Sequence, residues 1–159
     1  LDAEGSIQYG MYYWDDNYPD SHVFAEGECL RKTFDPDFML YHTMAVDEWG
    51  HMKGADSAEY ANAVAAVGHL IAARMPEWLE KGYQVVVTAD HGMNNLGIHV
   101  GTEHAQREVA LYIFSDKVEN GRFEENYISQ LNVAPMVCRL LGIPAAEGMK
   151  QELEIAFAK

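Results

Sequence analysis

The sequence predicts a layered α/β domain with a mostly parallel sheet. Two apolar runs, FMLYHTMAV at 38–46 and YQVVVTAD at 83–90, are typical of buried strands. Between them, residues 57–75 carry apolar side chains at helical spacing, and a further apolar run and helical pattern follow at 108–114 and 133–141. Strands that alternate with helices indicate a layered α/β architecture. A chain of 159 residues, 48% hydrophobic, is long enough for one domain with its own core.

The N-terminal part is expected to hold one short helix. The first twenty residues are aromatic and acidic, and glycine and proline interrupt any period, so they predict an irregular, partly packed segment. Residues 21–32 place apolar side chains at roughly helical intervals, with Ser21 as the expected cap, although Gly27 weakens the pattern.

The central helix is expected to begin near Asp56 and to stop before Pro76, because proline lacks the N–H that a helix interior needs. Asp56 and Glu59 resemble a capping box. A second short helix is expected over 76–81, and Gly82 suits the left-handed position that follows a helix.

The C-terminal half is expected to contain the centre of the sheet. The run at 83–90 has almost no polar interruption, which is typical of a strand covered on both faces in a parallel sheet. A Gly/Asn-rich loop at 92–107 and a strand at 108–114 should follow, and then a helix at 133–141 that Gly142 closes.

Charge and cysteine content exclude some classes of protein. Acidic residues outnumber basic ones by 25 to 11, a net charge of −14, which argues against binding double-stranded nucleic acid. No apolar run is long enough to predict a membrane span. Cys29 and Cys138 show no zinc or redox spacing and are expected to be packed thiols. Unpaired cysteines favour the cytoplasm, but the compartment stays open.

Five side chains form a candidate metal cluster. The run at 38–46 leads into VDEWGH, with Asp47 and His51, and the run at 83–90 ends at Asp90 and His91. The carboxyl ends of neighbouring parallel strands meet at one edge of a sheet, so these residues should converge there, with His99 folding back over them. His104 is the alternative to His99.

The donor types indicate which metals to expect. Imidazole and carboxylate together suit Zn²⁺, with Mn²⁺ or iron as further options. Because five ligands exceed what one tetrahedral zinc ion needs, two divalent metal ions are expected.

Three segments carry a resemblance to a known family. DHGMNNLGIHVG, preceded by VVVTA and followed by REVALYIF, resembles the metal-binding segment of the alkaline phosphatase superfamily, closest to its type I phosphodiesterase/nucleotide pyrophosphatase branch. VDEWGHMKG is similar to a second metal-binding segment of that family, with one extra residue before its glycine, and NVAPMVCRLLGIP resembles the closing helix. The resemblance implies an alkaline-phosphatase-like fold.

The resemblance also implies how the ligands divide. Asp47, His51 and His99 would bind one ion, and Asp90 and His91 would bind the other. Family enzymes complete the second ion with a further Asp and attack phosphorus with a Ser or Thr, and no Ser or Thr of this chain lies in the expected strand-then-helix context. Residues 1–159 are therefore expected to be a single domain, the C-terminal part of an alkaline-phosphatase-like catalytic domain, incomplete at its N-terminal side and close to inactive alone.

The implied function is metal-dependent hydrolysis of phosphate esters, most naturally diesters or pyrophosphates, with a small phosphate-ester or nucleotide-like substrate. A sulfatase or a phosphate mutase of the same superfamily is the enzymatic alternative. A non-catalytic metal-binding fragment that self-associates across its open sheet is the alternative from another class.

Side chains outside the cluster leave two further questions. The aromatic group at 12–18, comprising Tyr12, Tyr13, Trp14 and Tyr18, either borders a substrate pocket that stacks a base or only packs. His42 is either a partner of a metal ligand or a core histidine.

Overall fold

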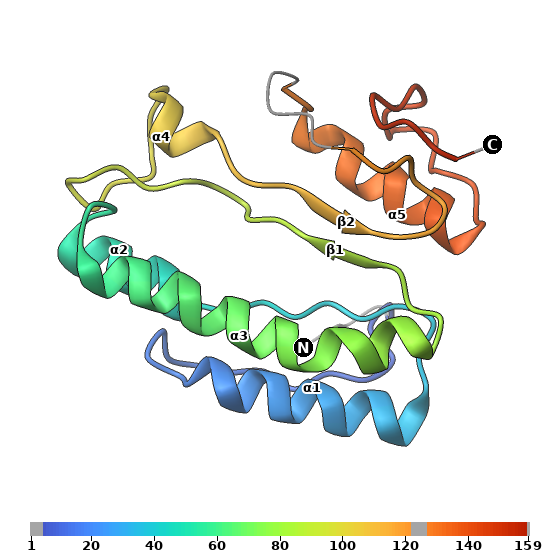
Figure 1. Ribbon diagram of the computed structural model, residues 1–159, viewed down its shortest axis with the longest axis horizontal. Helices are drawn as coiled ribbons and strands as arrows, with labels where there is room; N and C mark the ends of the chain where they lie inside the picture. The colour runs from blue at the N-terminus through green and yellow to red at the C-terminus, as the bar shows by residue number, and fades with distance from the viewer. Residues whose placement is uncertain (1–4, 122–126, 159) are drawn as a thin grey trace. The chain divides into compact units, whose positions relative to one another are not determined.

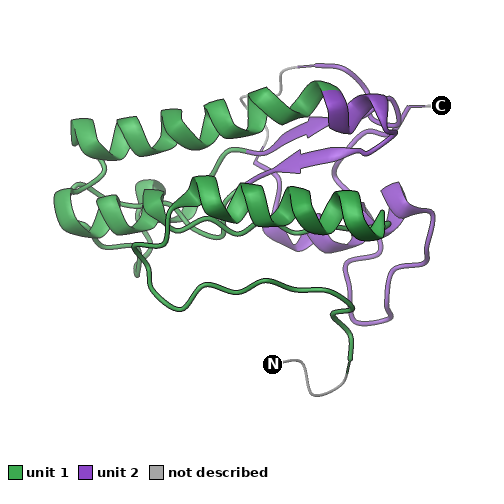
Figure 2. Cartoon of the chain, turned by 90° about the horizontal axis from the view of Figure 1, so that it is seen from below, with its two compact units in different colours: residues 1–76, 89–110 green, residues 77–88, 111–159 purple. Residues whose placement is uncertain are grey.

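The computed structural model describes residues 5–121 and 127–158 of the chain. The protein is α/β, with a small two-stranded sheet, and its chain forms two compact units. Unit 1 comprises Leu1–Pro76 and Ala89–Ala110, and unit 2 comprises Glu77–Thr88 and Leu111–Lys159 (Figure 2).

The first helix of unit 1, α1 (Asp20–Phe34), confirms the helix expected at 21–32 (Figure 1). Its cap differs from the expectation, because the N-cap is Pro19 and Ser21 lies inside the helix. The Asp20 carboxylate faces another segment of the unit, where its Oδ1 accepts from the backbone N–H groups of Met44 and Ala45 at 3.2 and 3.4 Å.

The strand expected at 38–46 is wrong. Neither strand of the described sheet pairs with this run, Leu40 is 78% exposed, and α2 (Ala45–Lys53) begins inside it. The N–H groups of Met44 and Ala45 that a neighbouring strand would bind are taken by Asp20. Apolar composition alone did not reveal this competing acceptor.

Helix α3 (Ala58–Glu80) is continuous through Pro76, so the break expected there is wrong. Proline removes one hydrogen bond from a long helix, and the turn beyond it is anchored by Trp78, which is 7% exposed. The helix begins differently too, since Ser57 Oγ accepts from the Tyr60 N–H at 3.1 Å where an Asp56 cap was expected. Gly82 follows the helix with a φ of 87°, as expected.

Unit 2 is built on two short strands, β1 (Val85–Val87) and β2 (Tyr112–Phe114). They pair antiparallel with Val86 opposite Ile113, so the parallel pairing and the fully buried central strand expected from the sequence are wrong for this pair. An apolar run gives no information on strand direction, because direction depends on the partner strand.

The core of unit 2 forms where α5 (Val133–Leu141) packs on the sheet. Met136, Leu140 and Ile155 are buried there, and Val86 packs against them. A short helix, η1 (Gln130–Asn132), precedes α5, and Gly142 with a φ of 75° ends it, as expected.

Two other expectations concern exposure. No helix among residues 5–121 and 127–158 is long and apolar enough to cross a membrane. Neither cysteine forms a disulfide; Cys138 is half-buried as a packed thiol would be, but Cys29 is exposed because its position on α1 faces solvent.

Candidate metal centre

The first two expected ligands share one face of α2. Asp47 and His51 are four residues apart, a spacing that brings side chains together on a helix, and Asp47 Oδ2 lies 3.5 Å from His51 Nε2. Asp47 is in the first turn of α2, where the helix dipole favours a carboxylate, and His51 is in the last turn.

The other three expected ligands come from the loop after β1. His91 Nε2 lies 3.7 Å from Asp47 Oδ1 and 3.6 Å from Asp90 Oδ2. The His99 ring stacks on His91 with centroids 3.8 Å apart and meets the His51 ring edge-on at 5.0 Å. The structure therefore gathers all five side chains within unit 1.

The tightest group is Asp47, His51 and His99, whose candidate ligand atoms all lie within 4.8 Å of one another. His104, the alternative to His99, is outside this group. Its side chain is 87% exposed and pairs with Glu108 four residues along the chain.

Backbone carbonyls orient two of the imidazoles. His51 Nδ1 lies 2.8 Å from the Gly97 carbonyl oxygen, and His91 Nδ1 lies 3.0 Å from that of Gly92. Because a carbonyl only accepts, each Nδ1 carries a proton, and in a neutral imidazole the lone pair is then on Nε2. The Nε2 atoms are the ones that face Asp47, which is the tautomer and orientation that a metal ligand needs.

The turn that presents Gly97 is held by the buried side chain of Asn94. Its Oδ1 accepts from the N–H groups of Leu96 and Ile98 at 3.0 and 2.9 Å. Gly97 has a φ of 73°, and a Cβ added there would lie 2.6 Å from the His51 carbonyl oxygen. The glycine thus allows the loop to approach α2 closely enough for the His51 hydrogen bond.

Gln106 is a residue that the sequence reasoning missed. It lies in α4 (His104–Arg107), a short helix within the loop expected at 92–107, and is 6% exposed. Its Nε2 donates to the carbonyls of Ile98 and Val100 at 3.3 and 3.1 Å, on either side of His99. The reciprocal capping box that Gln106 forms with Glu103 has the sequence pattern E-x-x-Q, a signal that was present.

The cluster passes a test for metal binding on its own geometry. Asp47 Oδ1 is buried and is without a hydrogen-bond partner among the described residues. A buried acceptor left without a partner costs about 1–3 kcal/mol, so its retention needs a compensating role. His91 Nε2 lies 3.7 Å from this oxygen, and imidazole nitrogen with carboxylate oxygen is a donor set that Zn²⁺ and Mn²⁺ accept.

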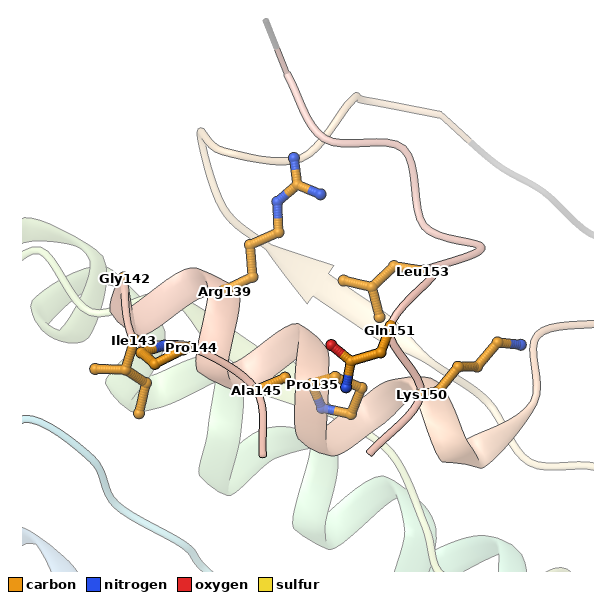
Figure 3. Close-up of a pocket in the computed structure, with 9 residues that line it drawn as sticks. All are labelled: Pro135, Arg139, Gly142, Ile143, Pro144, Ala145, Lys150, Gln151 and Leu153. Atoms are coloured by element: carbon orange, nitrogen blue, oxygen red, sulfur yellow. The ribbon is translucent and has the colours of Figure 1, made fainter. Parts of the chain in front are cut away.

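The centre is open to solvent. The Asp90 side chain is 72% exposed and that of His51 45%. None of the five residues lines either of two cavities, one of 710 Å³ walled by α1, α2 and α3 in unit 1 and one of 380 Å³ beside α5 in unit 2 (Figure 3). The cluster therefore lies at the surface of the described chain rather than in a closed cavity.

An aromatic side chain lies close to the centre. The Tyr13 hydroxyl shares a hydrogen bond of 2.6 Å with Nδ1 of His42, which is exposed, so His42 is neither a core histidine nor a partner of a metal ligand. Burial raises the pKa of Tyr13, and the charges of Asp16, Asp20 and Asp90 raise it further.

Comparison with known proteins identifies the family. A model of the type I phosphodiesterase / nucleotide pyrophosphatase family matches residues 12–133, which include all five clustered side chains. The chain belongs to this family. The resemblance to the alkaline phosphatase superfamily is thereby confirmed.

Curated relatives of the chain are GPI ethanolamine phosphate transferases. The chain is 28% identical over 157 residues to the mouse GPI ethanolamine phosphate transferase 3 catalytic subunit, covering 94% of the chain and 14% of that protein. The human protein of the same name is 30% identical over 115 residues, covering 70% and 10%. The fission yeast GPI ethanolamine phosphate transferase 2 is 25% identical over 132 residues, covering 70% and 17%. The chain thus spans less than a fifth of these relatives. No solved structure matches it.

Proposed function

We propose that the five clustered residues form a two-metal centre for phosphoester chemistry. Asp47, His51 and His99 hold one divalent ion, and Asp90 and His91 contribute to the second. The observation that carries this proposal is Asp47 Oδ1, a buried carboxylate oxygen without a hydrogen bond in the described chain and faced by imidazole nitrogen. Zinc is the proposed metal and manganese the alternative.

The ions, when bound, would neutralise charge on the phosphoryl oxygens and favour the attacking oxygen in its anionic form. The chain's own residues do the positioning. The Gly97 and Gly92 carbonyls fix the tautomers of His51 and His91, and Gln106 fixes the backbone on both sides of His99. This preorganisation leaves little rearrangement when a phosphate group arrives.

The reaction proposed is cleavage of a phosphodiester, with the phosphoryl group passed to an alcohol or to water. The names of the curated relatives favour transfer of an ethanolamine phosphate group to an alcohol. Hydrolysis of a phosphodiester or pyrophosphate, as the family name describes, is the second candidate. A Ser or Thr nucleophile is proposed to lie outside residues 1–159, since the chain covers only a small part of its relatives.

Elemental analysis of the purified chain tests the metal ligands. We expect bound zinc or manganese in the wild type, and its loss in His51→Ala, His99→Ala and Asp90→Ala. His104→Ala is the matched control, because it removes an exposed imidazole outside the cluster. Retention of metal by His99→Ala and its loss from His104→Ala would reverse the assignment of these two histidines.

Phosphorus NMR tests whether the centre receives a phosphate group without depending on the nucleophile. The Mn²⁺-loaded chain should accelerate the phosphorus relaxation of a simple alkyl phosphate beyond the effect of dissolved Mn²⁺, and Asp90→Ala should abolish the difference. Equal relaxation with and without the chain would rule out phosphate binding at the metal centre.

A further inference from the structure

Aromatic rings near the start of the described chain form a connected group within unit 1. Tyr13 stacks on Tyr18 with ring centroids 6.0 Å apart, and the Trp14 ring is tilted against that of Tyr18 with centroids 6.3 Å apart. Trp14 is 89% exposed and Tyr12 is 59% exposed. We call residues 12–20 the aromatic–acidic segment, because the same stretch carries three carboxylates.

The charge of this segment lacks a counterpart nearby in the sequence. The first Lys or Arg of the chain is Arg31, whose guanidinium binds Glu28. Asp15 and Asp16 are exposed, and neither carboxylate has a hydrogen bond or ion pair within the described ranges. Aromatic faces beside two such carboxylates produce a local potential that attracts cations and repels anions.

Backbone and side-chain contacts hold the segment against the element that carries Asp47. Asp20, at the end of the segment, accepts hydrogen bonds from the N–H groups of Met44 and Ala45, where α2 begins. Tyr13 shares a hydrogen bond with His42, three residues before α2 begins. The charge of the expected ligand Asp90 reaches Tyr13 and contributes to raising its pKa. The segment and α2, which carries Asp47, are therefore held together within unit 1.

We propose that the aromatic–acidic segment binds the organic ammonium group of a substrate whose phosphate is held at the metal centre. The proposal rests on the proposed function, because it assigns the phosphate to the metal centre. The ammonium lies on the Trp14 and Tyr18 rings, and Asp15 and Asp16 provide the opposite charge. A nucleobase can stack on the same rings, but it is neutral, so the adjacent carboxylates attract it far less than they attract an ammonium group.

Binding to the metal-loaded chain distinguishes these ligands. The probes are O-phosphoethanolamine, propyl phosphate, which has a methyl group in place of the ammonium, and adenosine monophosphate. Each is titrated into the chain, and binding is followed by the Trp14 indole NMR signal and by the phosphorus signal. We expect O-phosphoethanolamine to bind about fivefold tighter than propyl phosphate, the size of an exposed cation–π contact assisted by charge.

Variants of the segment should remove this preference and nothing else. Trp14→Leu and Asp15→Asn/Asp16→Asn should each bind O-phosphoethanolamine and propyl phosphate with equal affinity, and the affinity for propyl phosphate should stay that of the wild type. Binding to Trp14→Leu is measured by the phosphorus signal, because this variant lacks the indole. Asp35→Asn/Asp37→Asn is the matched control, since it removes the same charge from exposed positions of unit 1 outside the segment and should keep the preference.

Each result decides the proposal. Equal affinity of the wild type for the two alkyl phosphates overturns it, and tighter binding of adenosine monophosphate that depends on Trp14 replaces it with base stacking. If none of the phosphate compounds binds, the proposed function fails, and ethanolamine alone then tests the segment on the metal-free chain. If ethanolamine shifts the Trp14 signal and Asp15→Asn/Asp16→Asn abolishes the shift, the ammonium site is supported independently of the metal centre. If ethanolamine causes no shift, the ammonium site is overturned as well.

Discussion

The carboxylate of Asp47 and the imidazole of His91 come from different segments of the chain, yet Asp47 Oδ1 lies 3.7 Å from His91 Nε2. This separation is longer than a hydrogen bond, and Oδ1 is buried without another donor among the described residues. Two ligand groups held this close without a hydrogen bond between them fit the proposal that each binds one ion of a two-metal centre. Without a metal ion this buried oxygen costs stability, whereas with a metal ion it is a ligand, so a substitution at Asp47 should affect stability and metal binding in opposite directions.

Asp47→Asn should separate metal binding from stability. We expect the metal-free variant to be as stable as the wild type or more stable by about 1–3 kcal/mol, because a buried carboxylate oxygen without a hydrogen bond is costly. Added zinc should stabilise the wild type and not the variant. Urea unfolding with and without metal measures both effects, and Asp56→Asn, at an exposed position, should behave as the wild type. A metal-free variant clearly less stable than the wild type would show that Asp47 has a structural partner instead.

Gly97→Ala should be much more harmful than Gly82→Ala. Both glycines have positive φ, 73° and 87°, so alanine costs about 1–2 kcal/mol of backbone strain at either position. A Cβ at Gly97 also meets the His51 carbonyl, whereas one at Gly82 meets nothing within 4 Å. We expect thermal unfolding to show a loss of about 2–5 kcal/mol for Gly97→Ala and zinc affinity to fall with it. Equal losses in the two variants would mean that the loop does not need this close approach.

Gln106→Glu should weaken metal binding although Gln106 touches no metal. The substitution keeps the size of the side chain but removes the N–H groups that bind the Ile98 and Val100 carbonyls around His99. Loss of such a supporting contact typically lowers metal affinity by about 10–100-fold. Gln151→Glu is the matched control, since Gln151 also donates to two carbonyls, those of Ala146 and Met149, from an exposed position in unit 2. Competition with a zinc chelator measures the affinities, and similar values for the two variants would contradict a positioning role for Gln106.

The sequence was most informative where the signal is local. The spacing of Asp47 and His51 and the adjacency of Asp90 and His91 follow from residue type and chain order. The choice of His99 rested on the family resemblance, and the structure brings these five together. The helical periods of α1 and α5 likewise depend only on neighbours in the chain, and both helices lie where they were expected.

The sequence was misleading where a distant group decides the structure. The run at 38–46 has the composition of a strand, but Asp20 takes the backbone donors where it joins α2. The direction of β1 is set by β2, which the composition of β1 does not encode. Gln106 was hidden because a polar residue in a loop is usually solvated, and only the folded chain shows it buried against the carbonyls beside His99.

Tyr41, a half-buried tyrosine that packs against Phe24 of α1, should make the stability of the protein sensitive to alkaline pH. Burial and the charge of Glu28 raise the Tyr41 pKa well above its usual 10.0. The Tyr41 hydroxyl also donates a hydrogen bond of 3.2 Å to the Glu28 carboxylate. Because the folded state holds this proton more tightly than the unfolded state, the contribution of Tyr41 to stability is complete below about pH 10 and is lost as the pH rises above that value. Tyr41→Phe should therefore show a smaller fall in unfolding free energy between about pH 9 and pH 12 than the wild type. Urea unfolding across this range measures the slope, with Tyr127→Phe, 77% exposed, as the control that should follow the wild type. Identical slopes for Tyr41→Phe and the wild type would show that the Tyr41 proton is not held by the fold.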